Sequence, residues 1–372
     1  MKTTRPRQAV VLLGVTVAAA LMLSACSSDT VKVVGDKSAV SQTGAADKTL
    51  DPNPPTTWPG PDKSAPAQKG KSVTVVTCTS ASPAVQDMAA GVSDAAKSLG
   101  WDVTVVDGKS STTVQTSAIE GAITAKTNGI ITMCIEPSTI PTALQSAKKA
   151  GIPVISASSS IEDTPLIAGY SAYPMVGYGK LAADWIIKDS GGKAKVVVID
   201  TPNLPELHLT QSTVVDEIKK CKDCTLLEDA QISFADSLSP KMGSLISSLN
   251  QRYQSNMEYV VLPYGGAWGQ AGPAIRALGR KDLKVVAYDG DSLLTQGCKE
   301  GLVQAAPAFN LPWLGWAAAD QLNRVFAGQK PLTDTTVPAF LMTQANCQDV
   351  PDASSLVKLD YASQYKKLWG VD

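Results

Sequence analysis

The chain alternates short runs of β-branched residues with stretches of helical periodicity, and this alternation restricts its fold more than any other feature. Residues 73–77 are typical of a strand, and Ser82-Pro83 then supplies a helix N-cap with proline at the first helical position. Apolar residues recur at helical spacing from Val85 until Gly100 ends the segment. Strands joined by such helices form a parallel sheet with right-handed crossovers.

Two series of these units follow one another along the chain. Further strands of the first are expected at 103–106, 130–133 and 152–155, with helices from near Thr112 and Ser138. The second begins near Pro174, with strands at 196–199, 226–227, 259–262 and 285–288 and a helix opened by Ser239-Pro240. Two α/β lobes of this kind build a cleft between the carboxyl ends of their strands, where small molecules bind.

The start of the chain indicates export. Three basic residues among the first seven precede an apolar run over 9–23, and Ser24-Ala25-Cys26 follows. This order resembles a bacterial lipoprotein signal, so we expect residues 1–25 to be removed and the thiol of Cys26 to be acylated. The alternative is an ordinary signal peptide or short anchor that happens to contain a cysteine. Acyl chains on Cys26 would tie an extracytoplasmic protein to the cell membrane, and two or more are needed for a stable anchor.

The segment after this signal has the composition of a linker. Residues 27–70 are rich in Ser, Thr, Asp, Pro, Gly and Lys and show no helical or strand period. Such a segment buries too little apolar surface to fold alone. We therefore expect residues 26–70 to form a lipidated cysteine and a disordered tether that holds the folded body off the membrane.

Composition excludes several classes of function. Hydrophobic residues make up 44% and charged residues 18%, which is typical of a folded chain with a sizeable core. The formal net charge of −1 makes nucleic acid a poor partner. His208 is the one histidine, and it is expected to face the cleft or to cap a helix. Without more histidines, and with no nucleophile elbow, phosphate loop or dinucleotide-binding glycine pattern evident, we expect no metal, no cofactor and no enzymatic activity.

Several short motifs, in their order and spacing, carry a family resemblance. They are Val75-Val76-Thr77 leading to Ser82-Pro83 and Gly91, Asn128-Gly129-Ile130-Ile131 before Pro137, the run 150–155, the segments 177–184 and 274–279, and Val285-Val286-Ala287-Tyr288-Asp289-Gly290. Together they resemble the bacterial periplasmic binding proteins of the ribose type, which serve ABC importers, from about Lys71 to Lys330. The resemblance implies the type I fold of that family, in which two parallel-sheet α/β lobes are joined by a three-strand hinge.

The resemblance also implies where the lobes divide. The first lobe would comprise residues 71–171 plus 311–339 and the second 172–310 plus 340–372, with crossings near Ser171, Asn310 and Phe340. In that family the lobes close on the ligand by hinge bending, and a membrane permease recognises the closed surface. We therefore expect a monomer whose partners are a sugar-like small molecule and the permease subunits of an ABC importer.

Candidate ligand residues follow the strands of the second lobe. Asp289 precedes a glycine at a strand end, and the matching family aspartate accepts hydrogen bonds from two sugar hydroxyls. An Asp-Gly turn or a helix cap is the alternative. Trp268 and Tyr264 lie in a glycine-rich loop, where a ring can pack on the C–H face of a sugar, although core packing is the alternative. Asn310 follows Phe309 at the second crossing, where the family places a polar amide and where Phe309 itself could be core.

Other positions depart from the sugar-binding pattern. Where the family has an Asp-Arg pair, residues 156–160 read Ser-Ala-Ser-Ser-Ser, which includes Ser158 and Ser159. The first loop offers Ser82, and Gln211 stands where the family has an arginine. These residues predict a hydroxyl-rich, weakly charged cleft that binds a small neutral ligand, a sugar or polyol, rather than an acid. A larger or less polar ligand stays open.

Six cysteines besides Cys26 remain, and an even number in an exported protein indicates disulfides. We expect three pairs: Cys78 with Cys134, Cys221 with Cys224, and Cys298 with Cys347. The Cys-x-x-Cys spacing of the second pair also occurs in thiol redox enzymes, where the motif opens a helix. Here the motif follows a helical stretch, which favours a structural disulfide that closes a surface loop.

The sequence therefore predicts a non-catalytic, membrane-anchored receptor that captures a solute and delivers it to an importer. A ligand-sensing lipoprotein that signals to a membrane receptor shares every feature of the cleft and stays open. A secreted thiol-redox or other enzyme is the least favoured alternative.

Overall fold

The structure is a computed structural model that describes residues 51–162, 164–333 and 337–371. All of them belong to one compact unit, residues 39–372. The expected signal, Cys26 and the first half of the expected tether lie outside the described residues. Within the described ranges, no helix has the length and apolar character that crossing a membrane requires.

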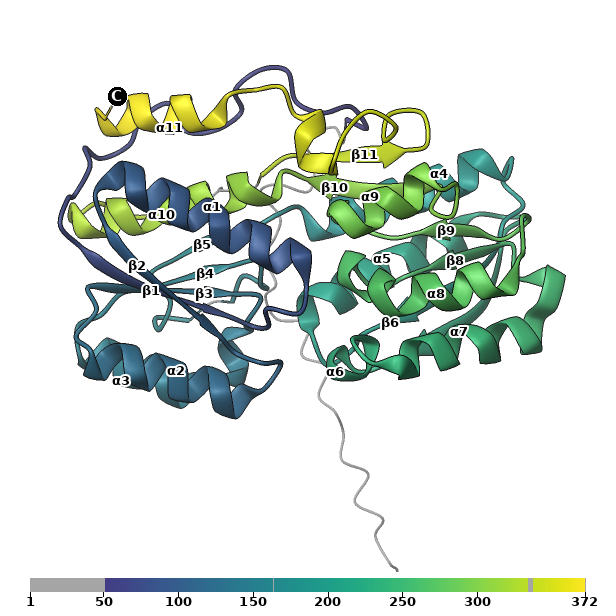
Figure 1. Ribbon diagram of the computed structural model, residues 1–372, viewed down its shortest axis with the longest axis horizontal. Helices are drawn as coiled ribbons and strands as arrows, with labels where there is room; N and C mark the ends of the chain where they lie inside the picture. The colour runs from purple at the N-terminus through teal and green to yellow at the C-terminus, as the bar shows by residue number, and fades with distance from the viewer. Residues whose placement is uncertain (1–50, 163, 334–336, 372) are drawn as a thin grey trace, which may run out of the picture. The chain divides into compact units, whose positions relative to one another are not determined.

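The first lobe is built on a five-stranded sheet in the order β2-β1-β3-β4-β5, and every pairing is parallel. Its strands are β1 Ser72–Thr77, β2 Asp102–Asp107, β3 Gly129–Met133, β4 Val154–Ala157 and β5 Gly169–Ser171. Its helices are α1 Pro83–Leu99, α2 Thr112–Thr124, α3 Pro141–Lys149 and α10 Leu311–Phe326, with the 3-10 turn η1 Pro137–Thr139. Helices α1 and α10 cover one face of this sheet and α2 and α3 the other (Figure 1). Strand β3 is buried throughout because it has a neighbour on each side and helices on both faces.

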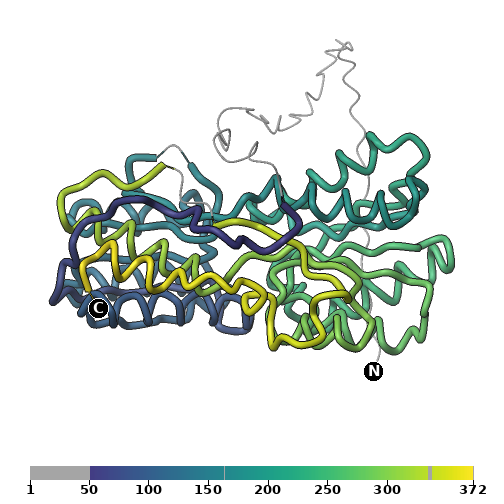
Figure 2. Tube along the Cα trace, turned by 90° about the horizontal axis from the view of Figure 1, so that it is seen from above, coloured from purple at the N-terminus to yellow at the C-terminus, as the bar shows by residue number. Residues whose placement is uncertain are grey.

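The second lobe is built on a six-stranded sheet in the order β11-β10-β9-β8-β6-β7, in which only the β10–β11 pair is antiparallel. Its strands are β6 Lys195–Asp200, β7 Thr225–Gln231, β8 Tyr259–Val261, β9 Lys284–Val286, β10 Ala305–Phe309 and β11 Ala339–Thr343. Its helices are α4 Met175–Asp189, α5 Pro205–Lys220, α6 Phe234–Ser237, α7 Pro240–Tyr253, α8 Trp268–Leu278 and α9 Ser292–Lys299. Short 3-10 turns follow at η2 Gln254–Asn256, η3 Gly265–Ala267 and η4 Ala353–Leu356. Helices α4 and α5 lie on one face and α7, α8 and α9 on the other (Figures 1 and 2).

The chain passes between the lobes at neighbouring points. It leaves the first sheet after Ser171, returns at Asn310 between β10 and α10, and enters the second sheet again at Ala339. The first and third of these segments touch, because the Val337 backbone N–H donates to the Ala172 carbonyl at 3.0 Å.

The last helix, α11 Tyr361–Trp369, departs from the expected division of the lobes. We expected residues 340–372 to lie with the second lobe, but α11 packs on α10 of the first. The Trp369 ring stacks on Trp316 at 5.4 Å, and its indole N–H donates to the Asp320 carboxylate at 2.8 Å. Burial of an aromatic ring stabilises the folded state, so the aromatic residues of α11 hold this helix against the first lobe.

The described part of the expected tether is also placed against the body. Trp58 stacks on Trp313 at 5.4 Å, and Ala65 is fully buried. The Ala67 N–H donates to the Trp369 carbonyl at 3.0 Å, and Pro52 accepts from the Leu341 N–H at 2.9 Å. Residues 51–70 therefore run beside α11 along both lobes instead of forming a free tether (Figures 1 and 2).

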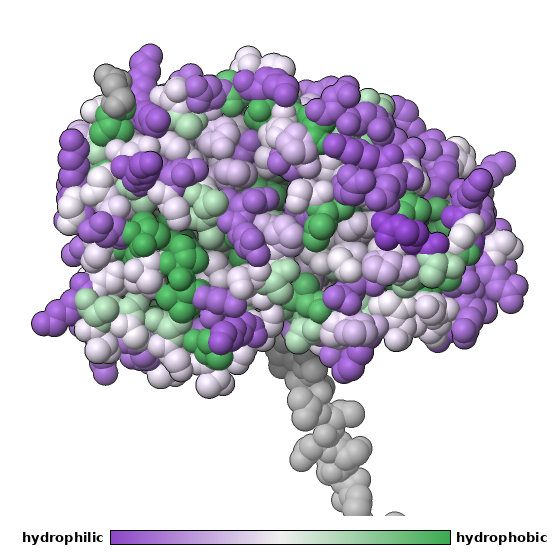
Figure 3. All heavy atoms as spheres, viewed as in Figure 1, coloured by the Kyte–Doolittle hydropathy of each residue, from purple (hydrophilic) through white to green (hydrophobic). Residues whose placement is uncertain are grey.

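The surface in view is polar over most of its area, with apolar side chains gathered mainly over the first lobe (Figure 3). Strand β2 lies at the edge of the first sheet, and its Val105 is 49% exposed. An edge strand with only one paired side has fewer neighbours to bury its residues.

Two of the three expected disulfides are formed. Cys221 is bonded to Cys224 in the loop after α5, and Cys298 of α9 is bonded to Cys347 after β11. Cys78 and Cys134 are free and buried, so the prediction of a third disulfide is wrong. The two strand ends do meet, but the thiols contact each other without a covalent bond.

Removing the Cys298–Cys347 bond is expected to destabilise the protein more than removing Cys221–Cys224. The bonds close loops with sequence separations of 49 and 3. The chain-entropy relation predicts losses of about 4 and about 2 kcal/mol respectively. Urea unfolding of the two double alanine variants measures both values, and equal losses would show that loop closure does not account for the stabilisation.

Candidate ligand-binding cleft

A cavity of about 40 Å³ lies between the lobes, at the carboxyl ends of strands from both sheets. The first lobe lines it with Cys78, Ser82, Ala84, Val85, Met88, Cys134 and Ser158. The second lobe and the crossings line it with Tyr173, Leu204, Glu206, Leu207, Phe234, Tyr264, Asp289 and Phe309. Parallel sheets present ligand-facing loops at this edge, so the topology itself brings these residues together.

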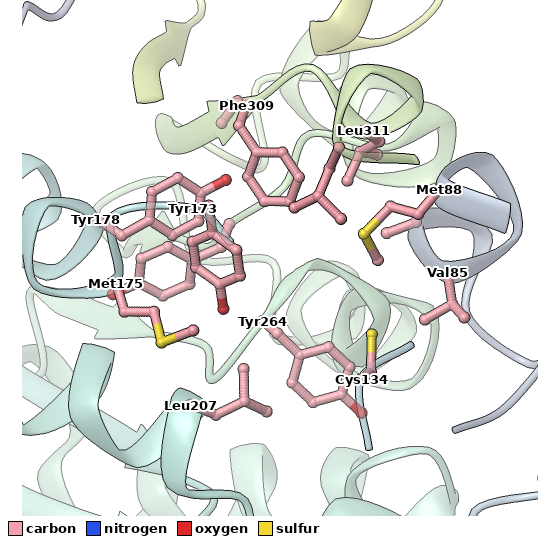
Figure 4. Close-up of a cluster of buried hydrophobic side chains, with 14 of the residues drawn as sticks. Val85, Met88, Cys134, Tyr173, Met175, Tyr178, Leu207, Tyr264, Phe309 and Leu311 are labelled. Carbon is pink, nitrogen blue, oxygen red and sulfur yellow. The ribbon is translucent and has the colours of Figure 1, made fainter. Parts of the chain in front are cut away.

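Aromatic rings form much of the cavity surface. Phe309 and Tyr173 are stacked at 4.8 Å with an interplanar angle of 12°. Tyr264 lies against Phe234 at 5.3 Å and shares a 2.7 Å hydrogen bond with the hydroxyl of Ser237. Figure 4 shows Met88 on the opposite side, facing these rings. The cavity thus offers flat ring faces on which a small ring can pack.

Asp289 enters the cavity just beyond β9. Its backbone has φ 73°, and its Oδ2 accepts a hydrogen bond from the Gly265 N–H at 3.1 Å. Burial raises the pKa of its carboxyl to about 7, and the Gly265 hydrogen bond opposes this shift. The side chain is therefore held in place at the strand end, where it lines the cavity.

Sequence reasoning missed the carboxyl group of Glu206 at the cavity, as well as the rings of Tyr173 and Phe234. Glu206 sits in the first turn of α5, directly after Pro205, and is 3% exposed. Its Oε2 has no hydrogen-bond partner among the described residues. Burial raises the pKa of this carboxyl well above its ordinary value, and the charges of Cys134, Glu136 and Asp289 add to the shift. The available signal was an acidic residue opening a helix after a predicted strand, but such residues commonly just complement the helix dipole.

Glu136 connects the two lobes beside the cavity. From the loop after β3, its Oε1 accepts from the N–H and the hydroxyl of Ser160, both at 3.2 Å. The same oxygen accepts from the Glu206 N–H at 3.3 Å, across the cleft. Burial raises the pKa of this carboxyl too, while the hydrogen bonds from Ser160 and Glu206 lower it. A carboxylate at the N-terminus of α5 is favourable, so this contact stabilises the closed arrangement.

Five of the expected ligand residues line the cavity: Asp289, Phe309, Tyr264, Ser82 and Ser158. Trp268 does not, because its ring packs under α9, where the position of a Cβ on Gly297 would fall 2.4 Å from it. Ser159 is turned away and shares a 2.6 Å hydrogen bond with Ser156.

Two expected polar residues serve the backbone instead of the cavity. Asn310 is the N-cap of α10, where its Oδ1 accepts from the Trp313 N–H at 2.9 Å and its Nδ2 donates to the Ser354 carbonyl at 3.1 Å. Gln211 is fully buried, and its Nε2 donates to the carbonyls of Leu262 and Pro263, both at 3.0 Å. These side chains fix the strand ends around the cavity.

The two free cysteines lie at the cavity, whereas the histidine does not. Cys78 and Cys134 line the cavity from the first lobe, and a hydrogen bond to Cys78, together with burial, raises the pKa of the Cys134 thiol. His208 is not at the cavity, because its Nδ1 pairs with Asp200 Oδ2 at 2.6 Å on the surface side of α5.

The charges at the cavity are of one sign. Its lining contains no lysine, arginine or histidine, whereas Glu206 and Asp289 both contribute carboxylates. Among the residues described, no three or more His, Cys, Asp or Glu side chains are grouped so as to hold a metal ion.

These carboxyls make stability depend on pH. Because the folded state raises the pKa of Asp289 from 3.8 to about 7, and those of Glu206 and Glu136 also upward, it binds more protons than the unfolded chain in this range. Stability must therefore fall as pH rises from about 4 to 7. Exposed carboxyls with lowered pKa, such as Asp282, act only below this window. The nearby thiol of Cys134 and the phenols of Tyr173 and Tyr264 have raised pKa values and titrate above it.

We expect the ligand-free protein to be less stable at pH 8 than at pH 5, by on the order of 3 kcal/mol. Urea unfolding at both values measures the difference, and Asp289→Asn should reduce it. A stability that stays level from pH 5 to pH 8 would contradict the raised pKa values.

Two α/β lobes with a cavity between the ends of their parallel strands define a bilobal binding protein. The chain belongs to the periplasmic binding protein domain family, whose model matches residues 73–330. The predicted resemblance and the α/β fold with parallel-sheet lobes are thereby confirmed. The family comprises solute-binding transport proteins, not enzymes.

Known relatives agree with this assignment. The ribose import binding protein RbsB of Bacillus subtilis is 24% identical over 314 residues, which cover 78% of this chain and 92% of RbsB. The structure of the Caulobacter myo-inositol binding protein bound to myo-inositol matches with a TM-score of 0.69 at 19% identity, covering 79% of this chain and 99% of that one. An ABC transporter solute-binding protein from Agrobacterium vitis, bound with alpha-D-tagatopyranose, also gives 0.69 at 19% identity, over 75% and 97% of the chains. These structures show the shared fold.

Proposed function

We propose that this protein captures a small solute of the sugar or polyol class in the cavity between its lobes and delivers it to an ABC importer. The observation that carries the proposal is the cavity itself, which both lobes enclose and which the Glu136 contact with α5 closes. The stacked rings of Tyr173 and Phe309 suit the C–H face of a compact ring, and Asp289 suits its hydroxyl groups. The relatives that bind ribose, myo-inositol or tagatose support this class of ligand.

The lobes are proposed to open and close about the three crossings near Ser171, Asn310 and Ala339. Opening would separate Glu136 from the N-terminus of α5 and give the solute a path to the cavity. Closure would then present a surface to the permease. Segments that pass side by side between two lobes can bend with small changes in a few residues.

Attachment to the outer face of the cell membrane is proposed through Cys26. The support is the order of basic head, apolar run and Ser24-Ala25-Cys26 at the start of the chain. Acylation there would keep the protein, as a monomer, close to the permease.

A thermal-shift screen over sugars, polyols and cyclitols tests ligand capture. A ligand at about 100 times its dissociation constant should stabilise the folded protein by about 2.7 kcal/mol. Uptake of the labelled ligand by cells lacking the gene then tests delivery to an importer. Unchanged uptake would contradict the transport role and favour a sensor, and the absence of any shift across the screen would contradict the proposed ligand class.

A further inference from the structure

The cavity between the lobes holds carboxyl groups that no basic side chain of the described protein faces. Glu206 and Asp289 line it, and Glu136 lies against the same helix N-terminus. None of these three carboxyl groups takes part in an ion pair among the described residues, although eight pairs with Lys or Arg occur elsewhere in that part of the chain. The cavity lining itself supplies no cation.

Glu206 shows where in the cavity a hydrogen-bond donor is missing. Its side chain is 97% buried against the cavity, and its Oε2 lacks any hydrogen-bond donor. The second oxygen of Glu136, beside it, is also without a partner in the described residues. A buried carboxylate without a partner is costly, so it is normally paired with a cation or protonated. The unpaired oxygen thus indicates a missing donor in the cavity.

The other surfaces of the cavity also suit a positive charge. The faces of aromatic rings carry negative electrostatic potential, and a cation placed within about 6 Å of a ring is attracted to it. Tyr173, Phe309, Tyr264 and Phe234 supply four such rings, and Met88 adds a polarizable thioether. Carboxyl groups and rings together line this space, and a charge-assisted hydrogen bond there would be stronger than a neutral one.

We propose that the solute carries a protonated amine, which binds Glu206 and Asp289 while the ring of the solute packs on Phe309 and Tyr173. The ligand is then an organic cation of sugar or cyclitol size, such as an amino sugar or aminocyclitol. This inference rests on the proposed capture of a sugar or polyol. It adds that a protonated amine on the solute determines which members of that class bind. It keeps the exclusion of acidic ligands that the sequence indicated, because an anion would meet the same carboxylates.

Calorimetry with matched pairs of probes tests the proposal on the full-length chain in detergent. The pairs are glucosamine with glucose, galactosamine with galactose, and scyllo-inosamine with scyllo-inositol, with tyramine and 4-ethylphenol as a pair outside the sugars. In each pair the second member lacks the amine. We expect at least one amine to bind at least tenfold more tightly than its neutral counterpart at pH 7.

The Glu206→Gln variant identifies the partner of the amine. Glutamine keeps the shape and removes the charge, so affinity for the amine should fall at least tenfold while any binding of the neutral member is unchanged. Glu217→Gln is the matched control, because it makes the same change on the same helix at a residue that pairs with Lys220 instead. It should leave the affinity for the amine unaltered.

The outcomes separate this inference from the proposed function. Tighter binding of a neutral sugar or polyol than of its amine would overturn the inference and leave the proposed function intact. Binding of tyramine alone would support the positive charge and overturn the sugar or polyol class. An amine that binds equally well to wild type and Glu206→Gln, or no binding by any of the four amines, would overturn the inference.

Discussion

Replacing Asp289 by alanine is expected to weaken ligand binding by about one to four decades while both lobes stay folded. The carboxylate sits at the end of β9, faces the cavity and is held by the Gly265 N–H at 3.1 Å. Its loss would leave ligand donors unpaired on closure, at about 1 to 3 kcal/mol for each buried group. Two such donors give the expected range, since each 1.4 kcal/mol is about a factor of ten.

The backbone at Asp289 requires a control for this prediction. Its φ of 73° is in the left-handed region, which asparagine tolerates better than alanine. Asp289→Asn therefore removes the charge with less backbone strain and should still weaken binding, although less than alanine does. Calorimetry with the solute identified by the thermal screen measures both variants. If the dissociation constant of each matched that of wild type, Asp289 would lie outside the ligand site.

Gly315→Ala is expected to destabilise the first lobe by about 2 to 3 kcal/mol, because α1 and α10 touch backbone to backbone there. A Cβ on Gly315 would fall 2.3 Å from the Met88 carbonyl and 2.5 Å from the Val92 nitrogen. Gly91 on α1 faces the same contact, where a Cβ would lie 2.1 Å from the Pro312 carbonyl. The backbones of two helices cannot shift as a flexible side chain can, so the helices must separate.

Gly121→Ala on α2 is the matched control for Gly315→Ala. Nothing lies within 4 Å of a Cβ at Gly121, so the added methyl group meets open space. Alanine in a helix interior is favoured over glycine by about 1 kcal/mol, so this variant should become slightly more stable. We therefore expect the same Gly-to-Ala substitution to change the free energy of unfolding in opposite directions at the two sites, as measured by chemical unfolding. A Gly315→Ala variant as stable as wild type would show that the contact between the helices is looser than described.

Much of the fold could be predicted because the signals are local. Alternating strands and helices fix the parallel sheets, and Asp289 follows a strand whose carboxyl end must face the cleft. The role of Asn310 is ambiguous in sequence, because a residue before Leu311-Pro312 is equally suited to a ligand site and to the N-cap that it forms. Trp268 is similar, since only the packing of α8 on α9 decides that its ring is buried.

The charge of the cleft could not be predicted from the same signals. Glu136 and Glu206 are far apart in the chain and come together only through the packing of the two lobes. The sequence around each of them, taken alone, predicts a solvent-exposed carboxylate near the start of a helical turn. Likewise, the ends of β1 and β3 bring Cys78 and Cys134 together, but whether neighbouring thiols bond depends on the orientation of their side chains.

Capture of the solute between the lobes is tested most directly by locking the lobes shut. Ser82 of the first lobe and Gly266 of the second meet across the cleft, where a Cβ on Gly266 would lie 3.3 Å from the Ser82 Cβ and 2.9 Å from its Oγ. A disulfide can join these positions in the combined Ser82→Cys and Gly266→Cys variant if the loop shifts by a few tenths of an ångström, which also relieves the 2.9 Å approach of the new Cβ to the Tyr264 ring. Mass mapping verifies that the new bond joins these two positions and not Cys78 or Cys134.

The measurement is retention of labelled solute, the one found by the thermal screen, after oxidation and exhaustive dialysis. Protein oxidised with the solute present should retain it until reductant is added, whereas protein oxidised without solute should fail to bind it. If the empty, locked protein bound the solute with the affinity of its reduced form, the solute would not enter between the lobes, and the assignment of the cavity as the ligand site would be wrong.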